Sequence, residues 1–518
     1  FKPELTQQLL DQLRPEHALI SFNSQNLSTH KIEPNYQVAY GIEAIAPELL
    51  KRWSSSSIHP DLSLPAPNPF IPDELHLKIA DTASLQPHLI QQDTNLAVWH
   101  QLDTSFKVPR SSLFIALHSA TANSSPRNTL LTSLLTGMIN KQLSSYAYPA
   151  HLAGLNYSIY ATERGLSISL SGYDQKQPIL LERIIAALKA PELTEKRFNI
   201  LKNRYQENLN NAKKQQPFHQ VLAELKRTLV ERHWTNEQKL VALQSLTQQD
   251  LVAYAAQFLE QLDITLLIQG NNTQQEAEQL AGFLKQQLDT SSSVVNVPPA
   301  GVIQLAEKSL TTRQLSIDNQ DAAIALYFQA TDDSAKTRAE TQLLGRIISS
   351  AFFADLRTKQ QLGYNLGAAA MSIKDVPGII FILQSPVISA PEIERRIHTF
   401  IDSFQSELEA LSIKDLEAYK TGLITRLMEA DKSLQKRSYR NWLEIDRNNI
   451  HFNTREQTAI AVKDIDKAQL ITRYKDSLIN NPRQFRSYAL GTQFSQDNFS
   501  DVAPITDTDA FKREHNKR

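Results

Sequence analysis

The amino-acid sequence predicts an α+β protein with two duplicated domains, each a mostly antiparallel sheet with helices packed on it. Three observations lead to this prediction. The chain has 518 residues, and a single hydrophobic core stops growing at about 250 residues. Two blocks of similar pattern, 73–290 and 302–518, each follow a proline-containing segment. In each block strand-like segments precede helix-like segments, the order typical of helices packed on one side of a sheet.

The first 50 residues contain too few elements for a domain of their own. Leu5, Leu9, Leu10 and Leu13 recur at helical spacing. The predicted elements are a helix over 3–13, a strand over 19–22 and a further segment over 37–45. We therefore expect residues 1–50 to be the tail of an upstream α+β domain.

Two segments have the composition of linkers. Residues 51–72 contain four consecutive serines and then five prolines, a composition that sustains neither a helix nor a central strand. The second linker runs over 291–301, through Pro298 and Pro299. The expected order is thus the tail 1–50, the linker 51–72, the first duplicated domain 73–290, the linker 291–301 and the second duplicated domain 302–518.

The two blocks repeat the same order of elements, and such repeats indicate architecture. The first block has predicted strands over 113–117 and 165–170 and predicted helices over 130–143 and 179–188. The second block has predicted strands over 324–328 and 378–383 and predicted helices over 339–348 and 392–404. Long helical stretches follow in both blocks, which favours duplicated α+β domains.

Composition excludes several classes of protein. Hydrophobic residues make up 41% of the chain and charged residues 21%, as in ordinary globular proteins. The formal net charge of -1 gives no electrostatic reason to expect a nucleic acid as partner. No segment approaches the roughly 20 apolar residues of a membrane span. The chain has no cysteine, so it has no disulfide, thiol nucleophile or cysteine-ligated metal.

The thirteen histidines include no pair with the spacing of a zinc motif. In H-E-x-x-H or H-x-x-E-H the two histidines lie on one helical face, and no two histidines here fall within five positions. Nucleophile-elbow and phosphate-loop motifs are also missing. The sequence therefore predicts no metal or cofactor site in this chain and no self-sufficient catalytic centre.

One segment, from Phe352 to Tyr364, combines a helix end with a cation and a phenol. The pattern predicts a helix through Leu356 that ends at Gly363 in the left-handed conformation. Tyr364 then opens a strand, so that the Arg357 guanidinium and the Tyr364 hydroxyl converge near a sheet edge. The alternative is an arginine on a solvated helix face and a tyrosine that covers the core. Spacing alone favours that alternative.

The run L-R-T-K-Q-Q-L-G-Y from Leu356 to Tyr364 resembles the signature in the C-terminal half of the pitrilysin/insulinase family of zinc metallopeptidases. Two further segments resemble the same family, Tyr146-Ala147-Tyr148 with Ala153-Gly154-Leu155, and Gly172 to Leu180. The likeness extends from Phe1 nearly to the C-terminus, and it favours the converging pair over the alternative.

The resemblance implies a clamshell of four α+β domains, two per half, closed around a chamber for peptides and small proteins. The family's zinc belongs to the N-terminal half, which this sequence lacks, so the chain alone is expected to be inactive. Arg357 and Tyr364 match the pair that this half contributes to the active site. Phe353 matches an apolar residue beside the scissile bond. The expected partners are the N-terminal catalytic half and peptide substrates, and the expected compartment is the periplasm.

Two other interpretations stay open. In the first, the chain is a naturally separate, non-catalytic scaffold or peptide-binding subunit. The incomplete domain over residues 1–50 favours a fragment instead. A basic stripe at Lys432, Lys436, Arg437 and Arg440 is a site for polyanions, a site for an acidic patch of the other half or, as for most such stripes, a solvated helix face.

Overall fold

The computed structural model describes residues 2–55, 57, 59–64, 66–79, 84–288 and 293–517. The chain divides into two units, Phe1–Pro67 and Asn68–Arg518. None of the helices that these residues form is both long enough and apolar enough to cross a lipid bilayer.

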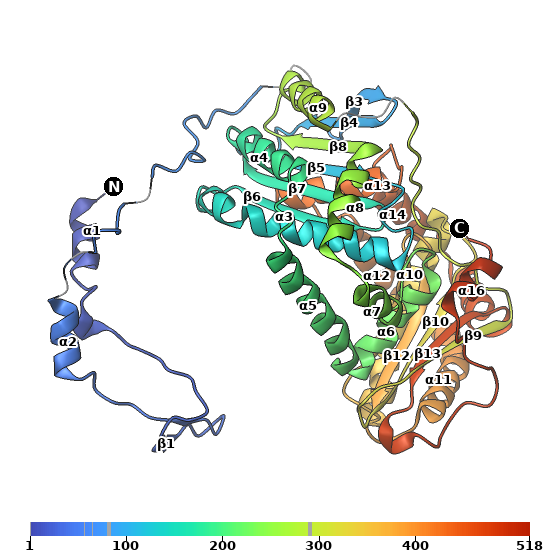
Figure 1. Cartoon of the computed structure of the whole chain (residues 1–518). Helices are drawn as coiled ribbons and strands as arrows, with labels where there is room; N and C mark the ends of the chain where they lie inside the picture. Colours follow the sequence, from blue (N-terminus) through green and yellow to red (C-terminus); the bar gives the residue numbers. More distant parts are fainter. Residues whose placement is uncertain are drawn as a thin grey trace. The chain divides into compact units, whose positions relative to one another are not determined.

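The unit Phe1–Pro67 consists of short elements, and none of its described residues is buried. It contains helix α1 (Pro3–Leu10), the 3-10 turn η1 (Pro15–His17), helix α2 (Pro47–Ser54) and the antiparallel pair β1 (Lys31–Ile32) and β2 (Ala39–Tyr40) (Figure 1). The strand predicted over 19–22 is wrong. Residues 19–22 pair with no neighbouring strand, and an isolated strand has no hydrogen bonds to hold it.

Two sheets form the framework of the unit Asn68–Arg518 (Figure 1). The first has the strand order β3-β4-β8-β5-β7-β6, and the second β11-β12-β10-β13-β9. The first sheet contains β3 (His88–Asp93), β4 (Leu96–Leu102), β5 (Arg110–His118), β6 (Asn156–Thr162), β7 (Gly165–Tyr173) and β8 (Asp263–Gly270). The second contains β9 (Ser309–Leu315), β10 (Ala322–Gln329), β11 (Leu366–Ala370), β12 (Gly378–Ser385) and β13 (Arg483–Ala489).

The two sheets share one topology, which confirms the predicted α+β fold and its duplication. Strands β4 to β8 take the places that β9 to β13 take in the second sheet, and β3 is an additional edge strand. The pairs β4–β8 and β9–β13 are parallel, and every other pair of these two sheets is antiparallel. Each sheet is therefore mostly antiparallel, as the sequence predicts.

Helices follow the strands in both blocks, and they include all four helices predicted there. The first block contains α3 (Pro126–Leu152), α4 (Gln177–Lys189), α5 (Glu195–Asn211), η2 (Ala212–Lys214), α6 (Pro217–Leu229), α7 (Asn236–Gln244), α8 (Gln248–Glu260) and α9 (Gln274–Leu288). The second contains α10 (Ala335–Phe352), α11 (Ala390–Ala410), α12 (Ile413–Leu427), α13 (Leu434–Asp446), α14 (Thr454–Asp464), α15 (Lys467–Lys475) and α16 (Thr508–Glu514). Three shorter helical segments complete it, η3 (Phe353–Lys359), η4 (Asp476–Asn480) and η5 (Thr492–Phe494).

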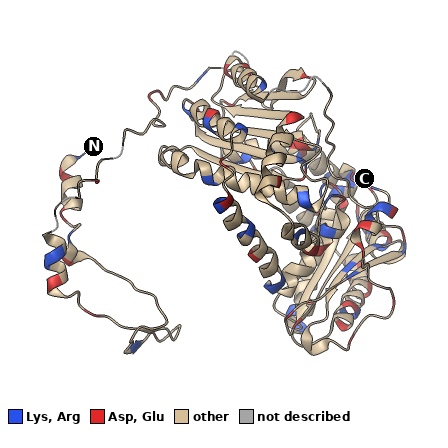
Figure 2. Ribbon diagram, viewed as in Figure 1, with Lys and Arg blue, Asp and Glu red and all other residues tan. Residues whose placement is uncertain are grey.

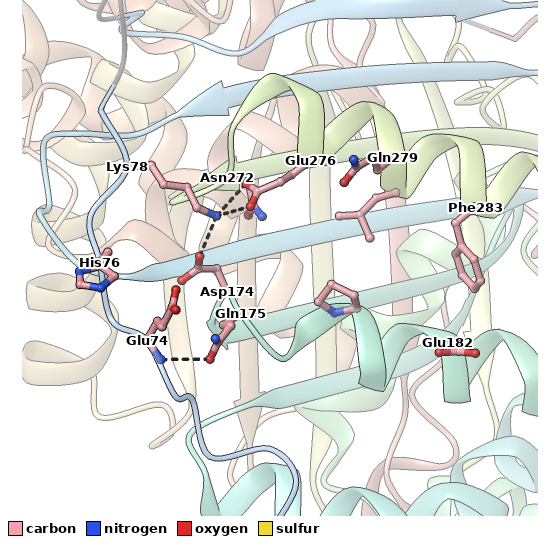
Figure 3. A pocket seen from close by; sticks show the side chains of 12 residues that line it. Glu74, His76, Lys78, Asp174, Gln175, Glu182, Asn272, Glu276, Gln279 and Phe283 are labelled. Carbon is pink, nitrogen blue, oxygen red and sulfur yellow. Dashed lines mark hydrogen bonds and ion pairs between the residues drawn. The ribbon is translucent and has the colours of Figure 1, made fainter.

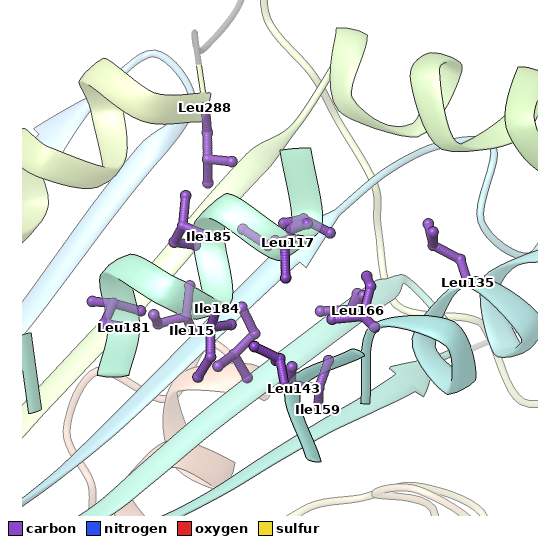
Figure 4. Packing of buried hydrophobic residues seen from close by; sticks show 14 of the residues in the cluster. Ile115, Leu117, Leu135, Leu143, Ile159, Leu166, Leu181, Ile184, Ile185 and Leu288 are labelled. Atoms are coloured by element: carbon purple, nitrogen blue, oxygen red, sulfur yellow. The ribbon is translucent and has the colours of Figure 1, made fainter. Parts of the chain in front are cut away.

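The main core of the first block lies between its sheet and the helices α3 and α4. Ile115 and Leu117 of β5 point to this side, because alternate residues of a strand face the same way. They pack with Leu143 of α3 and Ile184 of α4 in one buried cluster (Figure 4). Phe114 and Ala116, which alternate with them, belong to a separate cluster on the other face of the sheet. Burial on both faces explains why this strand is a continuous apolar run.

The two blocks exchange one helix each. Helix α6 of the first block supplies Val221 and Leu225 to a cluster on the second sheet, together with Tyr327 of β10. Helix α13 of the second block supplies Trp442 to the first sheet, where its ring stacks on Phe114 with the centroids 5.6 Å apart. Figure 1 shows α13 beside β5 and α6 beside β10. The contiguous spans 73–290 and 302–518 thus each depend on a helix from the other.

The predicted linkers lack regular structure over most of their described lengths. Helix α2 extends to Ser54, so the first residues of the span 51–72 are helical, and the described residues from 55 to 72 form no helix or strand. In the span 291–301, residues 291 and 292 lie outside the described part of the chain, and 293–301 form no helix or strand. The domain boundaries themselves stay a prediction.

Charges of both signs are interspersed over the helices (Figure 2). The predicted basic stripe on and before α13 is likewise interspersed with acidic residues. Arg437 pairs with Asp103 at 3.1 Å, Arg440 pairs with Asp431 at 2.7 Å, and Lys432 precedes the helix and pairs with Glu429. These ion pairs neutralise most of the stripe, and the first of them ties α13 to the first block.

Candidate functional site

The helix that carries the candidate residues ends differently from the prediction. The α-helical part of α10 ends at Phe352, and the chain continues as the π-helical segment η3. A π-helix has i→i+5 hydrogen bonds, and π-turns inside helices are frequent at functional sites. Gln361, with φ 55°, takes the left-handed conformation predicted for Gly363. The backbone N–H of Leu362 donates to the carbonyl of Leu356 at 3.1 Å and closes the helix end.

Gly363 is required for close packing, not for a left-handed turn. A Cβ at this position would lie 2.1 Å from the carbonyl oxygen of Gln384 on β12. The corresponding helix of the first block, α3, shows the predicted ending, since Gly154 follows it with φ 80°. The signal in the sequence was a glycine after a helix, and it does not distinguish these two uses.

Arg357 and Tyr364 meet as the sequence predicts. The Cζ atom of Arg357 lies 4.8 Å from the centroid of the Tyr364 ring, within the range of a cation–π interaction. Tyr364 is 82% exposed. Within the described chain neither the guanidinium nor the phenolic hydroxyl has a hydrogen-bond or ion-pair partner. The N–H and O–H groups of both side chains are therefore available to an acceptor.

Phe353 lies at the start of η3, four positions before Arg357. Its side chain is 49% exposed. Leu356, between them, is fully buried and anchors η3 to the core of the second block. The exposed phenyl ring, the guanidinium and the phenol thus come from one short stretch of chain. Together they offer an apolar surface and two kinds of hydrogen-bond donor.

Side chains from other elements hold this stretch in place. Gln360 donates to Asp355 Oδ2 at 3.1 Å, and its carbonyl oxygen accepts from Arg396 of α11 at 3.1 Å. After Tyr364, the amide of Asn365 donates at 2.8 Å to Gln216, the residue before the exchanged helix α6. Sequence reasoning missed these supporting residues, because their partners lie far along the chain and no local pattern marks them.

Arg396, the arginine that contacts Gln360, has an acidic partner. Arg395 and Arg396 both donate to Glu392 of α11. The hydrogen bond from Arg395, opposed by burial and helped by the bond from Arg396, lowers the pKa of Glu392 to about 2. Glu392 is therefore ionised at neutral pH and pairs with both arginines, so it offsets one of their two positive charges. Arg357 has no such partner among the described residues.

Among the described residues there is no group of three or more histidine, cysteine, aspartate or glutamate side chains placed to hold a metal ion. The resemblance places the family's zinc ion in the N-terminal half, and the described residues of this chain offer no such group of ligands for it. The chemistry available at Arg357, Tyr364 and Phe353 is hydrogen-bond donation and apolar contact.

Two family models match the chain. Residues 1–242 match the "middle or third domain of peptidase_M16", and residues 343–442 match "PQQ synthase PqqF-like, C-terminal lobe domain 4". Insulin-degrading enzyme of Homo sapiens is 30% identical over 498 residues, which are 94% of this chain and 49% of that protein. Insulin-degrading enzyme-like 1, peroxisomal, of Arabidopsis thaliana is 28% identical over 513 residues, 96% of this chain and 52% of that protein. The chain spans about half the length of the curated relatives it matches.

Among solved structures, pitrilysin aligns with all of this chain and 56% of its own, with a TM-score of 0.86 and 22% sequence identity. The fold is therefore that of one lobe of a pitrilysin-like peptidase. With the matches of the M16 models and of the curated relatives, the chain belongs to the pitrilysin/insulinase family. The name of the Arabidopsis thaliana relative places that protein in the peroxisome, and one similar solved structure is titled the periplasmic protease PqqL from Escherichia coli. The comparisons therefore do not decide the compartment, and the periplasm stays a prediction.

Proposed function

We propose that the chain is the zinc-free, C-terminal half of a zinc metalloendopeptidase that degrades peptides and small proteins in an enclosed chamber. Its partner is an N-terminal catalytic half, which holds the zinc. The observation that carries this proposal is the pair Arg357 and Tyr364, which lie together with their donors unpaired and Tyr364 largely exposed. A partner surface opposite them completes the site.

In the proposed reaction Arg357 and Tyr364 bind the carbonyl oxygen of the scissile peptide bond. Both are hydrogen-bond donors, and such bonds strengthen as the oxygen gains negative charge in the transition state. Phe353 contacts the apolar side chain next to that bond. The zinc ion supplies electrophilic and nucleophilic-water chemistry from the other half. This half therefore orients the substrate and stabilises charge.

Reconstitution tests this proposal. The isolated chain should bind no stoichiometric zinc and hydrolyse no peptide, and addition of the matching N-terminal half should produce turnover. In the reconstituted enzyme, Tyr364→Phe and Arg357→Ala should each lower kcat about 10²- to 10³-fold, the usual effect of losing one such donor. Zinc content, measured by atomic absorption, should stay unchanged.

Matched controls are Tyr148→Phe and Arg204→Ala, since both side chains are exposed on helices of the first block. They should leave kcat unchanged. Full turnover in both Tyr364→Phe and Arg357→Ala contradicts the assigned roles, and chelator-sensitive hydrolysis by the isolated chain contradicts the division into halves.

The second candidate function is a naturally separate, non-catalytic peptide-binding subunit. The chain's own mass is 58.5 kDa. A native protein of that mass in its source favours the subunit, and one of about twice the mass, as the half-length match to the relatives suggests, favours the enzyme half.

A further inference from the structure

A cavity of about 470 Å³ lies in the first block, away from Arg357 and Tyr364 (Figure 3). It lies between the segment 74–78, the start of α4 and the helix α9. Its lining is mostly acidic and apolar, with one lysine. Six of the lining residues are Glu74, Lys78, Glu182, Asn272, Leu280 and Phe283.

The wall formed by the segment 74–78 is fixed to both neighbouring loops. The backbone N–H of Lys78 donates to Asn271 Oδ1 at 2.8 Å, and Asn271 Nδ2 donates to the carbonyl of His76 at 3.0 Å. The backbone N–H groups of Asp73 and Glu74 both donate to the side-chain oxygen of Gln175. The cavity is therefore built by directed contacts from three parts of the chain.

One end of the cavity already holds an alkylammonium group, that of Lys78. Its Nζ lies 3.1 Å from Asp174 and 2.7 Å from Glu276, and its side chain is 25% exposed. Burial acts to raise the pKa of Glu276, but the hydrogen bonds from Lys78 and from the Thr273 backbone outweigh it and lower this pKa. The pairing of Lys78 with Asp174 and Glu276 indicates that the lining of this end of the cavity stabilises a protonated amine.

The remaining carboxylates of the lining have no cation. Lys78 is shared by Asp174 and Glu276, whereas the carboxylates of Glu74 and Glu182 have no ion-pair or hydrogen-bond partner in the described structure. Leu280 and Phe283 of α9 line the same space. Figure 3 shows Phe283 and Glu182 at the end opposite to Lys78. An apolar surface therefore adjoins unpaired negative charge.

A buried amide at the Lys78 end also lacks a partner. Asn272 is 6% exposed and lines the cavity, and its Oδ1 atom is buried without a hydrogen bond among the described residues. Its Nδ2 group likewise has no hydrogen bond there. An unpaired buried polar group costs free energy. A peptide group of a ligand supplies both partners, an N–H donor for Oδ1 and a carbonyl acceptor for Nδ2.

We propose that this cavity binds a lysine side chain of a peptide: the unpaired Glu182 carboxylate takes its ammonium group, Leu280 and Phe283 take its aliphatic chain, and the Asn272 amide pairs with a backbone peptide group. The preference for an alkylammonium group follows from the cavity itself. The assignment of a peptide as its carrier rests on the proposed function. The cavity then holds a substrate at a second point, outside the reacting bond.

Calorimetry on the whole chain tests this site without turnover, so its failure is distinct from failure of the peptidase proposal. The probes are an end-capped tetrapeptide with one lysine beside a leucine, the same peptide with norleucine in place of lysine, and 1,5-diaminopentane. The lysine peptide should bind and lose affinity as salt rises. The norleucine peptide should bind at least about tenfold more weakly, because it lacks the charge.

Variants locate the site. Glu182→Gln should weaken binding of the lysine peptide about fivefold, the upper range for an exposed ion pair, with circular dichroism and Tm unchanged. Glu278→Gln, on an exposed position of α9 outside the cavity lining, makes the same charge change and should have no effect.

If the norleucine peptide binds as tightly as the lysine peptide, the cavity does not recognise an ammonium group. Binding of 1,5-diaminopentane as tight as that of the lysine peptide overturns the peptide as carrier. If Glu278→Gln and Glu182→Gln weaken binding of the lysine peptide equally, the peptide does not bind in this cavity.

Discussion

Gly363 and Gly367 lie four positions apart in one segment but in different surroundings. A Cβ at 363 would meet the carbonyl oxygen of Gln384 at 2.1 Å, whereas a Cβ at 367 meets nothing within 4 Å. Gly363→Ala should therefore lower the free energy of unfolding by about 1–3 kcal/mol, the usual cost of overpacking. Urea unfolding of both variants measures the difference.

Gly367→Ala is the matched control and should be neutral or slightly stabilising, because it restricts the unfolded chain without a clash. In the reconstituted enzyme Gly363→Ala should also lower kcat, since it displaces the neighbouring Tyr364. Equal stability of the two variants contradicts the packing role of Gly363.

His118 makes the fold sensitive to mild acid. It is 5% exposed and its Nδ1 has no partner among the described residues. Burial, with the nearby Arg164 charge, lowers its pKa from 6.5 to about 3. The unfolded chain therefore takes up a proton first as the pH falls. Stability is complete above pH 6.5 and decreases below it by about 1.4 kcal/mol per pH unit for this histidine.

His118→Phe should reduce the slope of unfolding free energy against pH by this amount between pH 6 and 4. Urea titrations at several pH values measure it. His451→Gln, at an exposed position, serves as control and should leave the slope unchanged. A slope unchanged in His118→Phe indicates that this histidine is protonated in the folded state.

At the scale of elements, the two blocks end their equivalent helices differently. Helix α3 ends in a left-handed Gly154, whereas α10 continues through the π-helical segment η3 to Gln361. The seven residues of η3 contain Phe353 and Arg357. Divergence between the copies is thus located where the candidate site lies.

The exchanged helices link the site to the other block. Gln216, which precedes α6, binds Asn365, and the backbone N–H of Phe218 donates to Gln384 at 3.1 Å. The first block therefore supports the strand pair that follows Tyr364. Local periodicity indicates that α6 and α13 are helices, but it contains no information on which sheet each one covers.

At the scale of the molecule, the exchange predicts that both sheets of the unit Asn68–Arg518 unfold together. Each sheet has one face covered by a helix of the other block. Trp442 is 7% exposed. Trp442→Ala should therefore cost about 3–5 kcal/mol and lower the Tm of the whole unit in one calorimetric transition.

Gln435→Ala, at an exposed position of the same helix, should change the free energy of unfolding by less than about 0.5 kcal/mol. Two separate transitions, with only one shifted by Trp442→Ala, contradict the coupling of the two sheets.

By itself, the sequence determined the α+β class, the duplication and the meeting of Arg357 with Tyr364. The first two follow from apolar periodicity and from repeated order, which are local signals. The third follows from the resemblance of the run Leu356 to Tyr364 to the family signature, because spacing alone favoured an arginine on a solvated helix face. The tertiary structure alone decided the exchange of α6 and α13, the reason for Gly363, the failure of the strand over 19–22 and the cavity at Lys78. Each of these depends on contacts between residues distant in the chain, and a local pattern does not specify its distant partner.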